Sequence, residues 1–167
     1  MEVKKQPALT TNSNLPYFAS IKDVKQKKRQ FFSFLQPFVD EINREISQQR
    51  TFVESLHQWP SESVKQQKLK YLIKKYRIKP NNNFVVIKEK LLSRVDILPV
   101  ELVLMQAANE SAWGTSRFAI QANNLFGQWC FTEGCGLVPK ARASEASHEV
   151  RTFDTAQGSI RSYMHNL

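Results

Sequence analysis

The feature that most constrains the fold is an apolar run between Leu98 and Gly127 that surrounds a single carboxylate, Glu110. Pro99 suits the first turn of a helix, where its missing N–H has no partner to lose. The apolar residues that follow predict a helix that is buried on every side: Val100, Leu102, Val103, Leu104, Met105, Ala107 and Ala108. Gly114 is expected to end this helix in a left-handed cap.

The position of Glu110 at the exit of a buried helix has a chemical consequence. Desolvation disfavours a charged carboxylate, so a half-buried Glu110 would have a raised pKa and could donate a proton near neutral pH. The same spacing also fits an ordinary glutamate that bonds the ends of neighbouring helices. The residues around it are needed to choose between the two interpretations.

Length and charge divide the chain into regions. With 167 residues, 41% of them hydrophobic, the chain can form one sizeable core, and no run approaches the ~20 apolar residues that span a bilayer. We expect a flexible leader over residues 1–16, a basic helical region over 17–80 and a second domain over 81–167. The last residues read as a helix without a cap, which predicts a truncated C-terminal end.

Positive charge is concentrated in the first half. Residues 1–80 hold 16 Lys and Arg against 7 Asp and Glu, whereas residues 81–167 hold 8 of each. Such a surface favours polyanions, namely nucleic acid, anionic lipid or an anionic polymer, although a merely solvated basic face fits equally well. Without zinc-finger spacing or an RNA-binding aromatic motif, nucleic acid is not favoured.

Helical periodicity covers most of the chain before Gly127. From Ser20 the apolar residues recur at helical spacing, with a break or kink expected just before Pro37 and a long amphipathic helix over Phe38 to His57. The six phenylalanines between Phe18 and Phe52 are expected to pack in the core. After Gly127 the period disappears, and residues 128–153 predict a β-hairpin or irregular flap that ends in a short strand at 148–153. Asp154 or Thr155 is expected to cap a final helix.

Three motifs resemble one family of enzymes. Residues 106–116, which include Glu110-Ser111-Ala112-Trp113-Gly114, are similar to the catalytic-helix signature of lysozyme-like peptidoglycan hydrolases. Asn123-Asn124-Leu125-Phe126-Gly127 resembles the turn that follows the catalytic glutamate in glycoside hydrolase family 73. Residues 131–139 resemble the bacterial Bax protein family. The resemblance implies a mainly α, lysozyme-like α+β fold, with a helical lobe, a small β-hairpin flap and an N-terminal helical extension.

The resemblance also implies an activity and a set of site residues. It implies an endo-β-N-acetylglucosaminidase that hydrolyses β-1,4 bonds of peptidoglycan, with Glu110 as the proton donor. Tyr163 resembles the cleft tyrosine of the family, which orients water or the N-acetyl group. The residues expected to bind substrate are Trp113, Asn124, Phe126, Gly127 and Trp129.

The identity of a second catalytic carboxylate is open in the sequence. Glu133 lies in the Gly-rich flap and is preferred over Glu145, which lies in a stretch without anchoring residues. Glu149 is expected to point outward from a strand, and Asp154 is better explained as a helix cap. Assistance by the N-acetyl group of the substrate is a third alternative.

Cys130 and Cys135 allow two interpretations. A local disulfide that pins the flap is favoured in an oxidising compartment. A zinc site with His148 and His165 is the alternative, which the absence of CxxC spacing disfavours. No cofactor is expected.

The implied partners are peptidoglycan strands, with anionic envelope polymers or lipid bound through the basic half, and no nucleic acid. The protein is expected to be a monomer in the bacterial cell envelope, in the periplasm, with an export signal or anchor upstream. Two other classes remain, a non-catalytic peptidoglycan-binding module and a polyanion- or membrane-binding helical protein.

Overall fold

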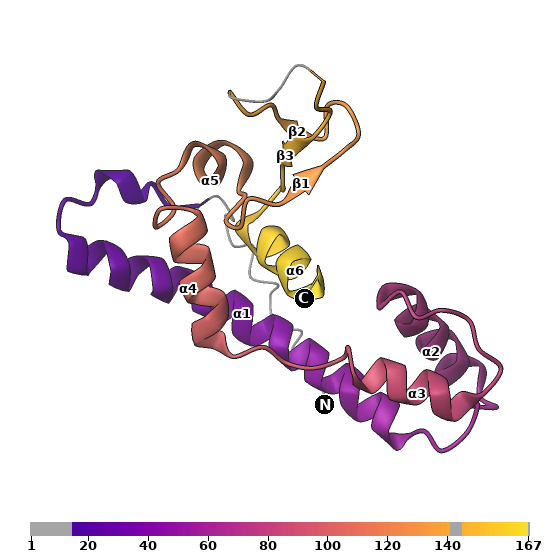
Figure 1. Cartoon of the computed structure of the whole chain (residues 1–167). Coiled ribbons are helices and arrows are strands. Elements are labelled where there is room, and N and C mark those ends of the chain that lie inside the picture. The colour runs from indigo at the N-terminus through magenta and orange to yellow at the C-terminus, as the bar shows by residue number, and fades with distance from the viewer. Residues whose placement is uncertain (1–14, 141–144, 167) are drawn as a thin grey trace, which may run out of the picture.

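The computed structural model describes residues 15–140 and 145–166, which form helices gathered on one long helix and a small sheet at one end (Figure 1). This confirms the expected mainly α, α+β class. Almost all of the expected leader, residues 1–14, lies outside the described residues. The elements are the 3-10 helix η1 (Phe18–Ser20), α1 (Val24–Ser55), α2 (Ser63–Lys75), α3 (Phe84–Leu92), α4 (Val100–Glu110), α5 (Arg117–Ala122), β1 (Trp129–Cys130), β2 (Gly136–Leu137), β3 (Glu149–Arg151) and α6 (Ala156–Asn166).

Helix α1 is continuous over 32 residues, so of the break or kink expected before Pro37 the break is wrong. Asp23 starts the helix, and its side chain accepts a hydrogen bond from the backbone N–H of Gln26 at 2.6 Å. Pro37 lies on the exposed side. The buried residues keep one helical phase on both sides of it, and this packing outweighs the hydrogen bond that proline removes: Phe31, Leu35, Phe38, Val39, Ile42, Ile46 and Val53.

The hydrophobic core is one cluster that extends from Phe18 to Met164. Helix α1 contacts α3, α4 and α6, so it supplies a face to elements from both halves of the chain. Most of the phenylalanines of α1 take part, as expected. Figure 1 shows α2 and α3 at the C-terminal end of α1, with α4, α5 and the sheet around its N-terminal half.

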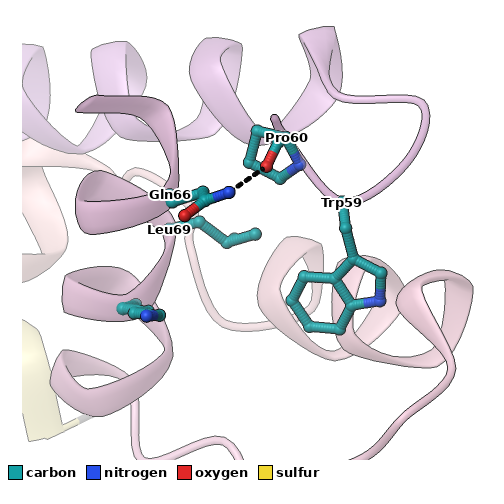
Figure 2. A pocket seen from close by; sticks show the side chains of 5 residues that line it. Trp59, Pro60, Gln66 and Leu69 are labelled. Atoms are coloured by element: carbon teal, nitrogen blue, oxygen red, sulfur yellow. Dashed lines mark hydrogen bonds between the residues drawn. The ribbon is translucent and has the colours of Figure 1, made fainter. Parts of the chain in front are cut away.

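The connection between α1 and α2 carries a small surface pocket of about 120 Å³. Trp59, Pro60, Gln66, Leu69 and Lys70 line it, and the Gln66 amide donates to the Pro60 carbonyl at 2.9 Å (Figure 2). The Trp59 ring packs edge-on against Phe84 of α3, with ring centroids 5.5 Å apart. This pocket therefore belongs to the α2–α3 end of the molecule.

The flap is a three-stranded antiparallel sheet in the order β1-β3-β2, one strand more than the single hairpin expected. β3 is the central strand. Its Val150 pairs with Trp129 of β1 on one side and with Leu137 of β2 on the other. β1 and β2 are consecutive in sequence, yet each pairs with β3 instead of with the other. No helix in the described part of the chain is both long enough and apolar enough to span a membrane.

Candidate active site

Glu110 is the last residue of α4, and its side chain is exposed. The half-burial expected from the sequence is therefore wrong. α4 buries Val103, Leu104, Ala107 and Ala108, whereas Leu102 and Met105 on its outer face are 45% and 47% exposed. α4 is buried on one side only, and Glu110 ends the helix in contact with solvent.

The chain leaves α4 through a tight reversal. The N–H of Trp113 bonds to the Ala108 carbonyl at 2.8 Å, and that of Ala112 to Asn109 at 3.5 Å, the pattern of a Schellman cap. The left-handed residue of this cap is Ala112, with φ 49°, and not Gly114 as expected. Trp113 and Gly114 continue in the left-handed region, with φ 59° and 73°.

Ser111 holds this reversal from inside. The residue is completely buried, its hydroxyl donates to the Ala107 carbonyl at 2.6 Å, and the same oxygen accepts from the N–H of Gly114 at 2.8 Å. The hydroxyl thus joins the last turn of α4 to the reversal beside Glu110. Sequence reasoning did not single out Ser111, although its place next to Glu110 in the signature was the available signal.

Trp113 packs against α1. Its ring lies edge-on to Phe31 and Phe32, with ring centroids 5.8 Å and 5.2 Å away, and the Lys28 ammonium sits 4.7 Å from its centroid. The indole is half-buried at the edge of the core. These contacts make Trp113 an anchor of the reversal to α1.

Asn124 organises the turn that carries Phe126 and Gly127. Only 1% of Asn124 is exposed, and its amide nitrogen donates to the carbonyls of Gln128 and Arg151, both at 2.8 Å. Its amide oxygen accepts from the N–H groups of Phe126 at 3.2 Å and Gln128 at 3.0 Å. With both ends of the amide used on backbone, this side chain shapes the turn and has no free group to offer a ligand.

Ser159 of α6, also missed by sequence reasoning, fastens the same turn. Its buried hydroxyl accepts from the N–H of Leu125 at 3.1 Å, and its carbonyl accepts from the Gln128 side chain at 2.9 Å. Gly127 has φ +63°, and apart from its chain neighbours no atom of the described residues lies within 4 Å of the position where a Cβ would be. The turn is therefore fixed at its base and open at Gly127.

Tyr163 of α6 stacks on Phe126. The ring centroids are 4.0 Å apart and the planes differ by 3°. Burial raises the pKa of the Tyr163 hydroxyl, and the negative charge of Glu110 raises it further. The charge of Glu110 at the end of α4 thus reaches the Tyr163 hydroxyl of α6.

The flap is braced on one side by a disulfide and a carboxylate. Cys130 and Cys135 form a disulfide with their Cα atoms 6.2 Å apart. Glu149 is only 5% exposed, and its two carboxylate oxygens accept from the N–H groups of Gly134 at 3.1 Å and Gly136 at 2.8 Å. The expectation that Glu149 points outward is therefore wrong, because the loop between β1 and β2 folds over its side chain.

The remaining candidates lie on or near the flap. Trp129 is 58% exposed, and its ring stacks on His148 with centroids 4.3 Å apart and planes at 20°. Glu133, in the turn between β1 and β2, and Glu145, shortly before β3, are both exposed. His165 lies elsewhere, on α6 against Tyr76, with ring centroids 5.8 Å apart.

Comparison with known proteins identifies the family of the chain. Residues 85–167 match the glucosaminidase family, described as mannosyl-glycoprotein endo-beta-N-acetylglucosaminidase. The chain is 32% identical to Protein bax of Escherichia coli (strain K12) over 164 residues, an alignment that covers 93% of this chain and 56% of that protein. The chain thus spans about half the length of this relative. No solved structure matches. The chain belongs to the Bax-like glucosaminidase family.

Proposed function

We propose that this protein is a peptidoglycan hydrolase that cleaves β-1,4 glycosidic bonds as an endo-β-N-acetylglucosaminidase. The observation that carries the proposal is the exposed Glu110 carboxyl at the end of α4, whose charge acts on the Tyr163 hydroxyl. The family description names a cut at N-acetylglucosamine in a mannosyl-glycoprotein. We propose that this protein cuts at the same sugar, N-acetylglucosamine, but in bacterial peptidoglycan. We also propose that it acts as a monomer in the periplasm.

In this proposal Glu110 is the general acid. It donates its proton to the glycosidic oxygen as the bond from that oxygen to the anomeric carbon breaks. In this step Glu110 acts only as the acid, and another group acts at the anomeric carbon. The fixed reversal through Ser111 and Trp113 holds the end of α4, so the carboxyl approaches the oxygen from one direction. Pre-positioning of this kind lowers the entropy that the reaction must lose.

Tyr163 and Phe126 would form the wall opposite Glu110. A tyrosine hydroxyl with a raised pKa stays protonated at neutral pH, so it can donate a hydrogen bond to the attacking water or to the N-acetyl carbonyl. The parallel Phe126 ring keeps the phenol in one orientation. Hydrolysis also needs a group that activates water or stabilises the positive charge at the anomeric carbon.

Glu133 is our choice for that second group. It lies in the loop that the disulfide and Glu149 hold together, whereas Glu145 lies outside that loop. An inverting enzyme requires the two carboxyls ~6.5–9.5 Å apart, and a retaining enzyme ~5–5.5 Å. The N-acetyl group of the substrate is the alternative nucleophile.

The test of the proposal is digestion of purified peptidoglycan with mass analysis of the new reducing ends. We expect ends in N-acetylglucosamine, and a loss of at least ~100-fold in kcat for Glu110→Gln. Glu101→Gln is the matched control, because Glu101 is an exposed glutamate in the first turn of the same helix. Equal turnover by Glu110→Gln and Glu101→Gln would refute the assignment, and binding of sacculi without any new ends would identify a non-catalytic module.

The second group is tested separately with Glu133→Gln and Glu145→Gln. A severe loss for Glu133→Gln alone supports our choice, and a severe loss for Glu145→Gln alone reverses it. If both variants keep nearly full activity, the N-acetyl group of the substrate is the nucleophile.

A further inference from the structure

We propose that His148 and Trp129 form a rigid platform that binds the face of a pyranose ring next to Glu110. The inference rests on the proposed function for its substrate class. It adds a positioning residue, His148, for which the sequence suggested only the role of a metal ligand. Three features of the flap carry it.

The first feature is the stacking itself. Trp129 is 58% exposed, yet its ring is not free in solvent, because the imidazole of His148 covers one of its faces at 4.3 Å and 20°. Pyranose rings present a face of C–H groups, which aromatic rings bind through dispersion and through the negative charge of their π face. The imidazole takes one face of the indole, and we assign the other face to such a ring.

The second feature is the register of the sheet. Trp129 pairs with Val150, and Cys130 pairs with Glu149. Successive side chains of a strand point to opposite faces, so Trp129 lies on the face that Val150 and His148 share. The disulfide and the Glu149 carboxylate lie on the other face. The aromatic pair therefore stands on the front of a sheet that is braced from behind.

The third feature is the distance along the chain to the proposed catalytic centre. Phe126 stacks on Tyr163, and Tyr163 responds to the charge of Glu110. Trp129 is three residues after Phe126, so their Cα atoms are at most ~11 Å apart. The ends of the intervening segment are fixed by the bonds of Asn124 and by the pairing of Trp129 with Val150. A glycan chain cut at Glu110 would thus pass Trp129 within a few sugar rings.

His148 acts on substrate only through Trp129. An exposed tryptophan on a two-residue edge strand would otherwise sample several rotamers and lose this freedom on binding. Stacking on the imidazole removes that freedom before the sugar arrives, and preorganisation of this kind increases affinity without a new contact. The platform is expected to affect KM much more than kcat, because it lies beyond the reacting bond.

The test is titration of the full chain with soluble N-acetylglucosamine oligomers by calorimetry, together with steady-state kinetics on the same oligomers. We expect Trp129→Ala to weaken binding about tenfold and Trp129→Phe to weaken it less. Trp59→Ala is the matched control, because Trp59 is 45% exposed and also packs on one aromatic ring, but it lies at the α2–α3 end (Figure 2). Trp59→Ala should bind as wild type does.

His148 is tested by a pair of variants. His148→Ala should raise Kd and KM about threefold with kcat unchanged, and His148→Phe should restore both, because a flat ring again supports the indole. His57→Ala, at an exposed histidine after α1, controls for loss of a histidine.

The platform would be overturned by wild-type affinity in Trp129→Ala, by an equal effect of Trp59→Ala, or by no rescue in His148→Phe. Absence of oligomer binding by the wild-type protein would also overturn it. The proposed function fails by a different result, namely undiminished hydrolysis by Glu110→Gln. Oligomer binding that depends on Trp129 would stand even then.

Discussion

Gly114 lies so close to Phe18 that a Cβ built on the glycine would meet the phenylalanine ring at 2.7 Å. The same atom would lie 3.2 Å from Phe31, and the glycine has φ +73°. The reversal after Glu110 is thus pressed onto η1 and α1 at the one residue of the motif that lacks a side chain. A side chain there would push the reversal away from the core.

We therefore expect Gly114→Ala to lower the free energy of unfolding by ~2–4 kcal/mol, from overpacking and the left-handed backbone together. Urea denaturation measures this change. Gly127→Ala is the control, because Gly127 has a similar φ of +63° but no atom within 4 Å of its Cβ position. A loss of ~1 kcal/mol is expected for Gly127→Ala. Equal losses for the two variants would show that backbone strain alone acts and that the contact with Phe18 does not.

Glu149→Gln tests the brace behind the flap. The amide keeps one acceptor oxygen but replaces the other with a donor, which would face the N–H of Gly134 or Gly136. We expect a loss of ~1–3 kcal/mol in the free energy of unfolding. Relative to wild type, hydrogen exchange should become faster in residues 131–136 and stay the same in α1. Glu133→Gln, at an exposed position in the same loop, should leave both measurements unchanged. An equal increase in exchange rate across the whole chain in Glu149→Gln would contradict a local brace.

His165 predicts a pH dependence of stability. Burial is the main cause that lowers its pKa to about 4. The positive charges of Lys75 and Arg161 act in the same direction, and the negative charge of Glu45 raises the pKa in part. The unfolded chain takes up this proton near the ordinary pKa of ~6.5, so the free energy of unfolding falls as pH decreases from ~6.5 towards 4. The expected loss is at most ~3 kcal/mol at pH 4.

Urea unfolding at a series of pH values measures this slope. His165→Phe should flatten it, and His57→Phe, at an exposed histidine, should not. The pKa of Glu45 is lowered, chiefly by its hydrogen bond from Arg161. Its stabilising effect is therefore lost only below the ordinary glutamate pKa, at a lower pH than most of the histidine effect. A slope above pH 5 that persists in His165→Phe would disprove the assignment to this residue.

The basic start of α1 predicts salt-dependent retention on anionic polymers. Replacing Lys25, Lys27 and Arg29 with glutamine should weaken retention on purified sacculi, most strongly at low salt, because exposed charges are screened over ~10 Å at 0.1 M. Lys28 is left in place because its ammonium contacts the Trp113 ring. Turnover of neutral N-acetylglucosamine oligomers should not change. Retention that ignores both salt and substitution would show that this surface is only solvated.

Local chemistry predicted several parts of the site, whereas tertiary contacts determined the rest. Residue type explains the left-handed cap at Asn123, with φ 50°, and the cap of α6 by Thr155, one of the two residues expected for it from the sequence. Glu149 was misjudged because a strand of three residues gives no evidence of the loop that folds over it. Pro37 was misjudged because its local penalty is smaller than the packing of the α1 face, which periodicity alone does not weigh against it. The central position of β3 depends on pairing across the chain, for which residue type gives no signal.

Because α1 lies at the centre of the core, the segment that matches the family and the segment that folds have different boundaries. The match to the glucosaminidase family begins at residue 85, but the surface that covers α4 and α6 comes from a helix that ends at Ser55. A fragment cut at the start of the match would expose apolar faces of both helices to water and would be expected to aggregate. The segment that matches the family is therefore smaller than the segment that folds. Gene fragments for expression should contain the whole folding segment, including α1.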